Sequence, residues 1–443
     1  MAHLGKHAIV IGASMGGLLA ARALADSYGE VTIVERDALT DAYEPRKGVP
    51  QGQHTHGLLA RGREGIEQLF PGFSEEMIAQ GAILIDLVDE VLWFNHGYYL
   101  HNLPSDMRGL AMSRPLLEGN VRRRLLKLPN VRLRDRCDVQ ALVSDRDGAR
   151  VTGVRVRMPG TPDRVETMEA DLVVDASGRG SRSPAWLDAL GYAKPREEAI
   201  QVNIGYMTQQ FRRRPDHLDG KLGVVMAACP PTWRFAALIA QEGERWIVSL
   251  GGYFGDHVPA GDAGLIDYAR SMPKPEIYDV LKDAEAISPP IPYMFSANLR
   301  RRYEALSRFP DGYLVCGDAV CSFNPVYGQG MTVACLEALA LGECLAAGPQ
   351  GLSRRFFQTI SRLIDVPWQI AVGSDLQHPR VQGKRTPQVR FINWYIAKLY
   401  YAAQRDSLLA RRFMEVANMS RPPPSLLEPR IALHVWRGNR PPA

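Results

Sequence analysis

The stretch IVIGASMGGLLAARAL, residues 9–24, decides the fold, and its centre has two interpretations that exclude each other. Residues 12–16 (GASMG) match the G-x-S-x-G elbow, which presents a nucleophilic serine between a strand and a helix. Residues 12–17 (GASMGG) also match the G-x-G-x-x-G dinucleotide-binding turn, with Ser14 in place of the second glycine. The flanking sequence must decide between a serine hydrolase and a nucleotide-binding protein.

The residues on both sides of this turn favour the dinucleotide-binding interpretation. An α/β-hydrolase forms other strands and an oxyanion loop before its elbow, whereas only 13 residues precede Ser14. Residues 7–37 instead predict a strand, a tight turn, a helix and a second strand that ends at Glu35, where an acidic side chain accepts hydrogen bonds from an adenosine ribose. We expect Gly12 to form the turn, Ser14 to let the backbone approach a pyrophosphate, and Gly17 to let the helix pack closely.

Composition sets limits on the class of protein. The chain has 443 residues, 46% hydrophobic and 23% charged, which indicates an ordered protein of two or three lobes. Its net charge is only +5 and its arginine runs lie far apart in sequence, so we expect no nucleic-acid partner. The six cysteines lack metal-ligand spacing, which favours a reducing, cytoplasmic location without a bound metal. No run of 18 apolar residues occurs, so no transmembrane segment is expected.

A second strand-turn-helix pattern follows in the last third of the chain. The apolar strand YLVCGD ends at Gly317-Asp318, and Pro325, Gly328 and Gly330 precede a long helical pattern. A carboxylate at the end of a strand suits polyol hydroxyls, and a helix opening at Gly330 directs free N–H groups at a ligand. Residues 200–254 alternate like an antiparallel sheet, and residues 351–443 are mostly helical. The predicted fold class is α/β, with a β-sheet lobe and a helical C-terminal region.

The chain resembles the class A FAD-dependent monooxygenases, the family with the para-hydroxybenzoate hydroxylase fold. The resemblance covers roughly residues 7–375 and is carried by IGASMGG with Glu35, SRPLLEGNV, DLVVDASGRGSR and GDAVCSFNPVYGQGMTVA. RKGVPQGQHTHGLLARG and PWQIAVGSDLQHP are similar to a natural-product epoxidase and hydroxylase subgroup, which also includes FAD-dependent spirotetronate-type cyclases. The family resemblance implies a discontinuous Rossmann-like FAD-binding domain (1–72, 105–184 and 292–350), a substrate domain (73–104 and 185–291) and a helical C-terminal region (351–443).

The family resemblance also implies residue roles. The two turns would hold the FAD pyrophosphate and ribityl chain, Glu35 the adenosine ribose, and the start of the second helix the flavin N1 and C2=O edge. The residues implied in FAD binding are Gly12, Ser14, Gly16, Gly17, Glu35, Arg36, Arg114, Val139, Asp318, Pro325, Gly328, Gly330 and Met331.

The implied reaction is hydroxylation or epoxidation of a bulky, apolar, natural-product-like small molecule through a flavin C4a-hydroperoxide, with NAD(P)H as electron donor. Where the family's second motif carries Asp-Gly, this chain has Ser177-Gly178, with Arg179 and Arg182 nearby as candidates to hold phosphates. This departure leaves open an alternative, a redox-neutral FAD-dependent cyclase of the [4+2] type in polyketide biosynthesis. The W-x-W-x-I motif of flavin halogenases does not occur.

Several further residues have both a functional and a purely structural interpretation. His54 and His56 are candidates to donate to flavin or substrate, and Arg46 is a candidate to reach a phosphate; otherwise they are ordinary loop residues. Trp233, Phe235 and Tyr253 would line an apolar substrate pocket or belong to the core. The amphipathic segment 390–417 would bind a membrane surface, pack across the FAD-binding lobe or form a homodimer interface.

Overall fold

The computed structural model describes residues 4–40, 42–158, 164–259 and 262–440. A five-stranded parallel sheet lies at its base, in the order β18 (Tyr313–Val315), β12 (Leu172–Asp175), β1 (Gly5–Ile11), β2 (Tyr28–Val34) and β8 (Val131–Arg134). All of these strands except β8 contain short buried apolar runs, because a parallel sheet is covered on both faces. The turn at residues 12–17 leads from β1 into α1 (Met15–Ala25) at the carboxyl edge of this sheet.

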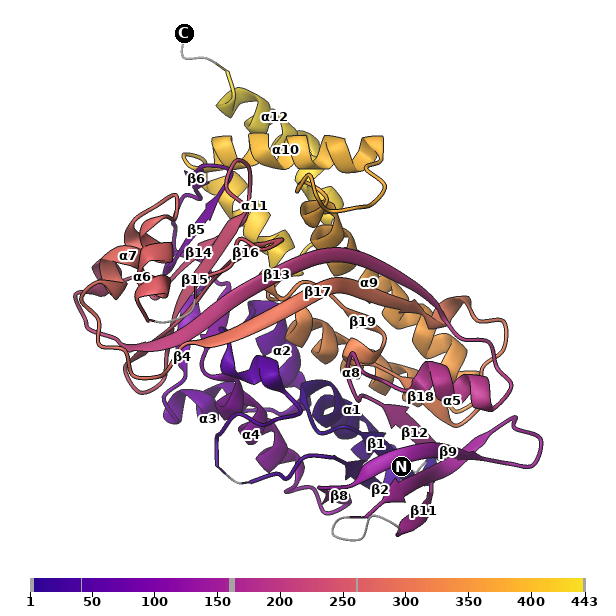
Figure 1. The fold of residues 1–443 in the computed structure, drawn as a ribbon. Helices are drawn as coiled ribbons and strands as arrows, with labels where there is room; N and C mark the ends of the chain where they lie inside the picture. Colours follow the sequence, from indigo (N-terminus) through magenta and orange to yellow (C-terminus); the bar gives the residue numbers. More distant parts are fainter. Residues whose placement is uncertain (1–3, 41, 159–163, 260–261, 441–443) are drawn as a thin grey trace.

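A second, eight-stranded sheet extends away from the first (Figure 1). Its order is β19 (Cys321–Ser322), β17 (Ile291–Arg302), β13 (Arg196–Arg212), β16 (Arg245–Tyr253), β15 (Arg234–Gln241), β14 (Gly223–Met226), β5 (Val91–Asn95) and β6 (Tyr98–Tyr99). Neighbouring strands are antiparallel except for β14 and β5. The long strands β13 and β17 connect the two halves of the molecule, so they place one wall of the larger sheet above the parallel sheet.

Smaller elements complete the two lobes. A three-stranded sheet of β3 (Gly57–Leu58), β7 (Arg108–Ala111) and β4 (Ile83–Asp86) accompanies α2 (Ala60–Leu69), α3 (Phe73–Ala79) and α4 (Arg114–Leu125). The meander β9 (Asp138–Ser144), β10 (Val151–Arg157) and β11 (Val165–Glu169) lies beside the parallel sheet, and α5 (Ser183–Ala189) follows β12. Helices α6 (Asp262–Arg270) and α7 (Glu276–Leu281) cover the far end of the larger sheet.

The chain is mostly helical from residue 330 onward, and the helical region predicted for 351–443 is confirmed over its described residues. Helix α8 (Gly330–Ala346) packs against α1, and α9 (Leu352–Asp375) packs against α8. Helices α10 (Pro387–Ala403), α11 (Ser407–Ala417) and α12 (Pro429–Gly438) share an apolar cluster with one face of the eight-stranded sheet. Phe391, Trp394 and Trp436 remain exposed on this helical region. Within the described residues, every helix is too short or too polar to cross a lipid bilayer.

The α/β class with a parallel nucleotide-binding-type sheet, a separate large sheet and a helical C-terminal region is therefore confirmed. The two faces of the eight-stranded sheet differ in what they contact. On β16, the even-numbered residues Trp246, Val248 and Leu250 are buried in the cluster with the C-terminal helices. Odd-numbered neighbours such as Ser249 face the loop before β3, where Ser249 contacts Thr55. This second face forms part of the candidate site.

Candidate functional site

The turn between β1 and α1 requires glycine at two positions. Gly12 has φ +101°, and a Cβ there would lie 2.7 Å from the carbonyl oxygen of Ala176. A Cβ on Gly17 would fall 1.9 Å from the carbonyl oxygen of Gly12, well inside contact distance. Ser14 precedes the helix, and its side chain forms no capping hydrogen bond, so the first N–H groups of α1 stay free for a ligand. This geometry is that of a phosphate-binding turn.

Among the described residues, the side chain of Ser14 has no hydrogen bond to an imidazole. Its Oγ donates to Glu118 Oε2 at 3.1 Å and accepts from Arg114 Nη2 at 3.0 Å. A serine nucleophile is activated by a neighbouring base, most often an imidazole. The Ser14 hydroxyl is instead part of an ionic cluster, which agrees with the dinucleotide-binding interpretation.

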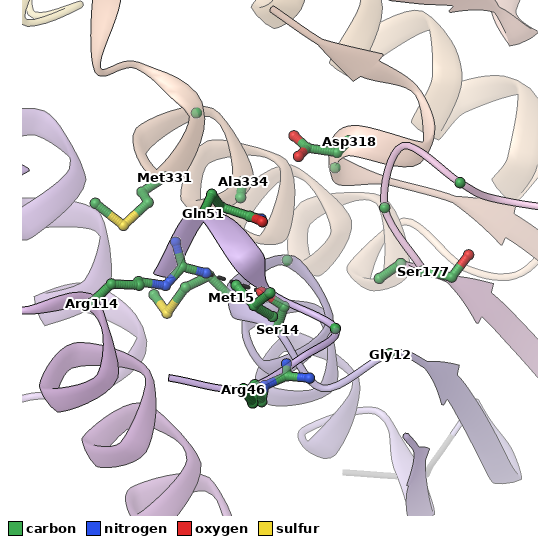
Figure 2. A pocket seen from close by; sticks show the side chains of 18 of the residues that line it. Gly12, Ser14, Met15, Arg46, Gln51, Arg114, Ser177, Asp318, Met331 and Ala334 are labelled. Atoms are coloured by element: carbon green, nitrogen blue, oxygen red, sulfur yellow. Dashed lines mark hydrogen bonds between the residues drawn. The ribbon is translucent and has the colours of Figure 1, made fainter. Parts of the chain in front are cut away.

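A cavity, called cavity 1 below, runs from this turn to the start of α8 and contains about 1700 Å³ of open space including its mouth. Figure 2 shows Arg114 and Ser14 directed at each other on its floor, with Asp318 and Ser177 on the other side of the view. The nominated residues that line cavity 1 are Gly12, Ser14, Gly16, Glu35, Arg36, Arg46, His54, His56, Arg114, Val139, Ser177, Arg182, Asp318, Pro325, Gly328, Gly330 and Met331. Gly17 does not line it and acts beneath the turn, through helix packing.

Glu35 lies where the sequence predicts, at the end of β2. Its carboxylate is buried and accepts hydrogen bonds from the backbone N–H groups of Ala13, at 2.8 Å, and Asp37, at 3.0 Å. It also pairs with Arg46 Nη1 at 3.2 Å. Glu35 therefore shapes the turn itself, in addition to presenting an acceptor at the edge of cavity 1.

Glu118, which the sequence analysis did not identify, joins three of the nominated residues. Its Oε1 accepts from Arg46 Nε at 2.9 Å, and its Oε2 accepts from Arg114 Nη2 at 3.0 Å as well as from Ser14. Burial opposes ionisation, but the charges of Arg114 and Arg46 outweigh it and hold the pKa of Glu118 below its ordinary value. One carboxylate thus orients two guanidinium groups and one hydroxyl at the floor of cavity 1.

The two arginines keep hydrogen-bonding capacity that the described chain does not use. Arg46 Nη2 and Arg114 Nε are buried and have no partner among the described residues. Arg46 also contacts Asp37 Oδ2 at 2.9 Å, so its orientation is set by several carboxylates. Buried donors without partners are costly, and guanidinium groups bind phosphate oxygens well. The floor of cavity 1 therefore fits the pyrophosphate of a dinucleotide.

The second predicted turn forms the opposite wall. Gly317 has φ +64°, and its N–H donates to Glu337 Oε2 at 2.6 Å. Glu337 comes from α8 and is buried, which raises its pKa to about 7. Asp318 presents its carboxylate to the open space of cavity 1 but is surrounded by protein, and this enclosure raises its pKa. An acceptor in this position fits the hydroxyl groups of a ribityl chain.

The start of α8 supplies free backbone donors. No side chain caps this helix, and Gly330 and Met331 line cavity 1. The N-terminus of a 17-residue helix carries a partial positive charge that stabilises a nearby anion. The turn before it, with Gly328 at φ +66°, positions this end of the helix against the cavity.

A buried polar network holds the loop between β19 and α8. Asp375 Oδ1 accepts from the hydroxyls of Tyr253, at 2.8 Å, and Tyr327, at 2.9 Å, and from Asn324 Nδ2 at 2.9 Å. Asp375 Oδ2 accepts from Asn298 Nδ2 at 2.7 Å. Burial raises the pKa of Asp375 although four neutral donors favour the carboxylate. The network anchors the loop that carries Pro325. Asp375 belongs to the PWQIAVGSD segment, which the sequence analysis quoted as part of a family resemblance without assigning a role to Asp375.

His54 and His56 both lie on the wall of cavity 1. His54 Nδ1 contacts Thr208 Oγ1 at 2.8 Å, and its ring packs edge-on against Tyr206 and Tyr293. Burial lowers the pKa of His54 to about 4. Burial, with a contribution from the Arg114 charge, lowers the pKa of His56 to about 3. Near pH 7 both imidazoles are therefore neutral and add no charge to the cavity.

The neutral state of His54 predicts a pH-dependent stability. An unfolded histidine binds a proton near pH 6.5, whereas His54 in the folded chain resists protonation down to about pH 4. Stability linked to His54 is therefore fully present above pH 6.5 and is lost as the pH falls from 6.5 toward 4. Between pH 6.5 and 5 we expect wild type to lose about 2 kcal/mol of unfolding free energy that a His54→Gln variant does not lose. Urea unfolding at both pH values measures this difference. An exposed-histidine variant, His101→Gln, should follow wild type, and parallel losses in wild type and His54→Gln would contradict the prediction.

The three aromatic candidates for a substrate pocket lie in an apolar cluster. Phe235 and Tyr253 are buried together with Tyr206 and Phe295, and Trp233 is half-buried with its ring 4.6 Å from that of His378. None of the three lines either of the two described cavities. Tyr206, from the same cluster, does line cavity 1.

Ser177 lies exposed at the end of β12, on the wall of cavity 1. Its backbone N–H donates to Asp175 Oδ1 at 2.8 Å, and Asp175 is buried with Ser181 Oγ as a further donor. Arg182 donates to Asp138 and Val139 and stacks on Trp186, whereas Arg179 contacts Ser322 and Phe295. Both arginines are thus engaged with the protein beside this wall.

No protein-family model matches the chain. Protein Rv3254 of Mycobacterium tuberculosis is 38% identical over 352 residues, which are 77% of this chain and 73% of that protein. Squalene monooxygenase 1,1 of Brassica napus is 22% identical over 338 residues, which are 76% of this chain and 62% of that protein.

Solved structures show the same fold at low sequence identity. The flavin-dependent brominase Bmp2 superposes with a TM-score of 0.68 at 14% identity, over 98% of this chain and 100% of that one. The Diels-Alderase PyrE3 of pyrroindomycin biosynthesis superposes with a TM-score of 0.62 at 15% identity, over 93% of this chain and 80% of that one. The chain therefore belongs to the family of Protein Rv3254 and has the fold of the class A FAD-dependent monooxygenases.

Proposed function

We propose that the chain is an FAD-dependent monooxygenase that hydroxylates or epoxidises a largely apolar small molecule. The observation that carries this proposal is the composition of cavity 1: a glycine turn and unpaired guanidinium donors at one end, and an uncapped helix terminus at the other. A dinucleotide needs both ends, because its pyrophosphate and its ring are bound by different chemistry. Relatives and structural neighbours that include a squalene monooxygenase and flavin-dependent enzymes support the assignment.

Each end of cavity 1 has a distinct task in this proposal. The turn of α1 binds the pyrophosphate together with Arg46 and Arg114, and Glu35 accepts from the adenosine ribose. Asp318 accepts from the ribityl hydroxyls, and the N–H groups at the start of α8 stabilise negative charge at the edge of the ring system.

Bound FAD would supply the oxygen-transfer chemistry, and the protein supplies orientation, electrostatics and exclusion of water. Tyr206, Phe323 and Met331 are buried apolar or aromatic residues on the wall of cavity 1 and fit an apolar substrate. His54 stays neutral near pH 7, so it adds no positive charge to the wall of cavity 1. The chain's own residues thus hold the reactants in a water-poor space and leave the bond chemistry to the cofactor.

A redox-neutral cyclase is the second candidate. Ser177 stands where the family resemblance leads us to expect aspartate, and it lies on the wall of cavity 1. The fold is also that of the Diels-Alderase PyrE3, so it is compatible with cyclisation. In such an enzyme the same cavity would hold FAD without any transfer of electrons from NAD(P)H.

Asp318→Ala tests the cofactor site. The variant should bind FAD roughly 30- to 150-fold more weakly, because removing an acceptor that serves ligand hydroxyls costs about 2–3 kcal/mol. Titration of the apoprotein with FAD, followed by flavin fluorescence, gives the affinity. Asp311→Ala, in the exposed turn before β18, is the matched control and should bind like wild type. Undiminished affinity in Asp318→Ala would remove Asp318 from the site.

Anaerobic reduction separates the two candidate reactions. Under nitrogen and with squalene present as an apolar probe, NADPH or NADH should bleach the flavin absorbance at about 450 nm. This absorbance is a property of the cofactor. Dithionite reduces flavins without binding at a nucleotide site, so it is the control that shows whether the bound flavin can be reduced. A flavin that dithionite bleaches but neither nucleotide reduces would favour the cyclase.

A further inference from the structure

We propose that a second cavity, called the amide chamber below, binds a neutral amide-type group of the substrate. It adjoins cavity 1, because His54 and Arg114 line both. Amide side chains recur in its polar lining, which includes Gln53, Gln80, Gln210 and Gln241. The inference rests on the proposed function only in placing the reacting part of the substrate in cavity 1.

The strand register places Gln241 on the wall of this chamber. Gln241 pairs directly with Arg245, and Thr208 pairs directly with Ser249. Directly paired residues share a face, and so do residues two apart along a strand, so all four side chains lie on one face of the eight-stranded sheet. Thr208 contacts His54 from this face, which identifies it as the face turned to both cavities.

The side chain of Gln241 has unused hydrogen-bonding capacity. It is 1% exposed, and neither its amide oxygen nor its amide nitrogen has a partner among the described residues. Leaving a buried donor or acceptor unpaired costs about 1–3 kcal/mol for each group. A primary amide offers a donor and an acceptor side by side, and another amide or a lactam is its natural complement. Gln241 is therefore suited to recognising one such group on a ligand.

The charges around the chamber favour a neutral ligand. Arg245 is paired with Glu242, whose Oε2 also accepts from the backbone N–H of Ser113 at 2.8 Å. Arg114 is paired with Glu118. Both arginines on the lining, Arg114 and Arg245, thus have a carboxylate partner, which reduces what an anionic group of a ligand would gain in the chamber. Leu116, Ile247 and Ile291 add apolar surface for the carbon skeleton around the amide.

The position of His54 between the two cavities indicates how one molecule would occupy both. Its buried ring packs against Tyr206, which lines cavity 1, and its Nδ1 contacts Thr208, which lines the amide chamber. A substrate that passes this ring would have its amide group held by Gln241 while another part lies in cavity 1. The chemical class that fits is an apolar skeleton with a secondary amide or lactam at some distance from the reacting carbon.

Titration with δ-valerolactam tests the chamber on the purified full-length protein with its bound flavin. Saturation-transfer NMR measures its affinity for wild type and for Gln241→Met, which keeps side-chain volume but removes both hydrogen-bonding groups. We expect at least tenfold weaker lactam binding to the variant, and at least tenfold weaker binding of δ-valerolactone, which lacks the N–H, to wild type. Gln404→Met, at the C-cap residue that follows α10, is the matched control and should bind the lactam like wild type.

Thermal unfolding completes the test. Because Gln241 is unpaired, Gln241→Met should unfold at the same temperature as wild type or at a higher one. Equal lactam affinity in wild type and Gln241→Met would overturn the proposal. So would a lower unfolding temperature of the variant together with no lactam binding to wild type, since Gln241 would then serve the fold. Lactam binding does not depend on flavin reduction, so a chamber that binds while NADPH fails to bleach the flavin contradicts only the monooxygenase proposal.

Discussion

Gly17→Ala should lower the free energy of unfolding by about 3 kcal/mol or more and abolish retention of the flavin. The reason is steric, because the new methyl group would lie 1.9 Å from the carbonyl oxygen of Gly12, which belongs to rigid backbone. Relief of this overlap requires α1 to move away from β1, and that movement displaces the N–H groups that we propose bind the pyrophosphate. Urea unfolding and the flavin content of the purified variant measure both effects.

Two other glycines serve as controls for this variant. A Cβ on Gly16 would be 3.9 Å from its nearest neighbour, the Cα of Gly317, and a Cβ on Gly342 in α8 would meet nothing within 4 Å. Gly16→Ala should therefore keep the wild-type fold, and Gly342→Ala should keep both the fold and the flavin. A stable, flavin-containing Gly17→Ala protein would show that the turn is not closed as described.

Glu118→Gln should destabilise the apoprotein far more than the flavin-bound protein. The change leaves Arg46 and Arg114 buried beside a neutral amide, and removing one partner of a buried ionic cluster costs about 3 kcal/mol. The pyrophosphate of FAD would bring two negative charges to the same guanidinium groups, so bound FAD should restore part of the loss. Unfolding temperatures with and without saturating FAD measure the difference.

A surface carboxylate provides the control for this prediction. Glu343 is exposed on α8, so Glu343→Gln should change neither form. If Glu118→Gln lowers the unfolding temperature equally with and without FAD, then Arg46 and Arg114 do not face the pyrophosphate. The result would then contradict the assignment of this end of cavity 1.

Much of the site could be predicted because its signals are local. The turn at residues 12–17 is defined by adjacent residues that only certain backbone angles allow, and Glu35 follows one strand later. Asp318 and Gly330 likewise belong to one strand-turn-helix unit. Parallel pairing of β1 with β12 and of β12 with β18 then brings these units to one edge of the sheet. Local patterns and one topological rule thus place most of the nominated residues on cavity 1.

The contacts that the sequence did not reveal join residues that are far apart in the chain. Arg46 and Glu118 are 72 positions apart, and Asn298 and Asp375 are 77 positions apart. No local periodicity in the sequence predicts such pairs. The Arg114–Glu118 ion pair is different, because the two residues are one helical turn apart and the sequence could have predicted their contact. Phe235 and Tyr253 show the opposite difficulty, because an aromatic residue on a strand has the same pattern whether it faces a cavity or a cluster.

The measurement that most directly tests the central claim is identification of the chromophore of the purified protein. If cavity 1 is a flavin site, the protein will carry FAD at about one molecule per chain. The bound cofactor will then give an absorbance maximum at about 450 nm. Reconstitution of stripped protein with FAD should restore both the spectrum and the unfolding temperature. A colourless protein that fails to bind added FAD and gains no stability from it would contradict the account.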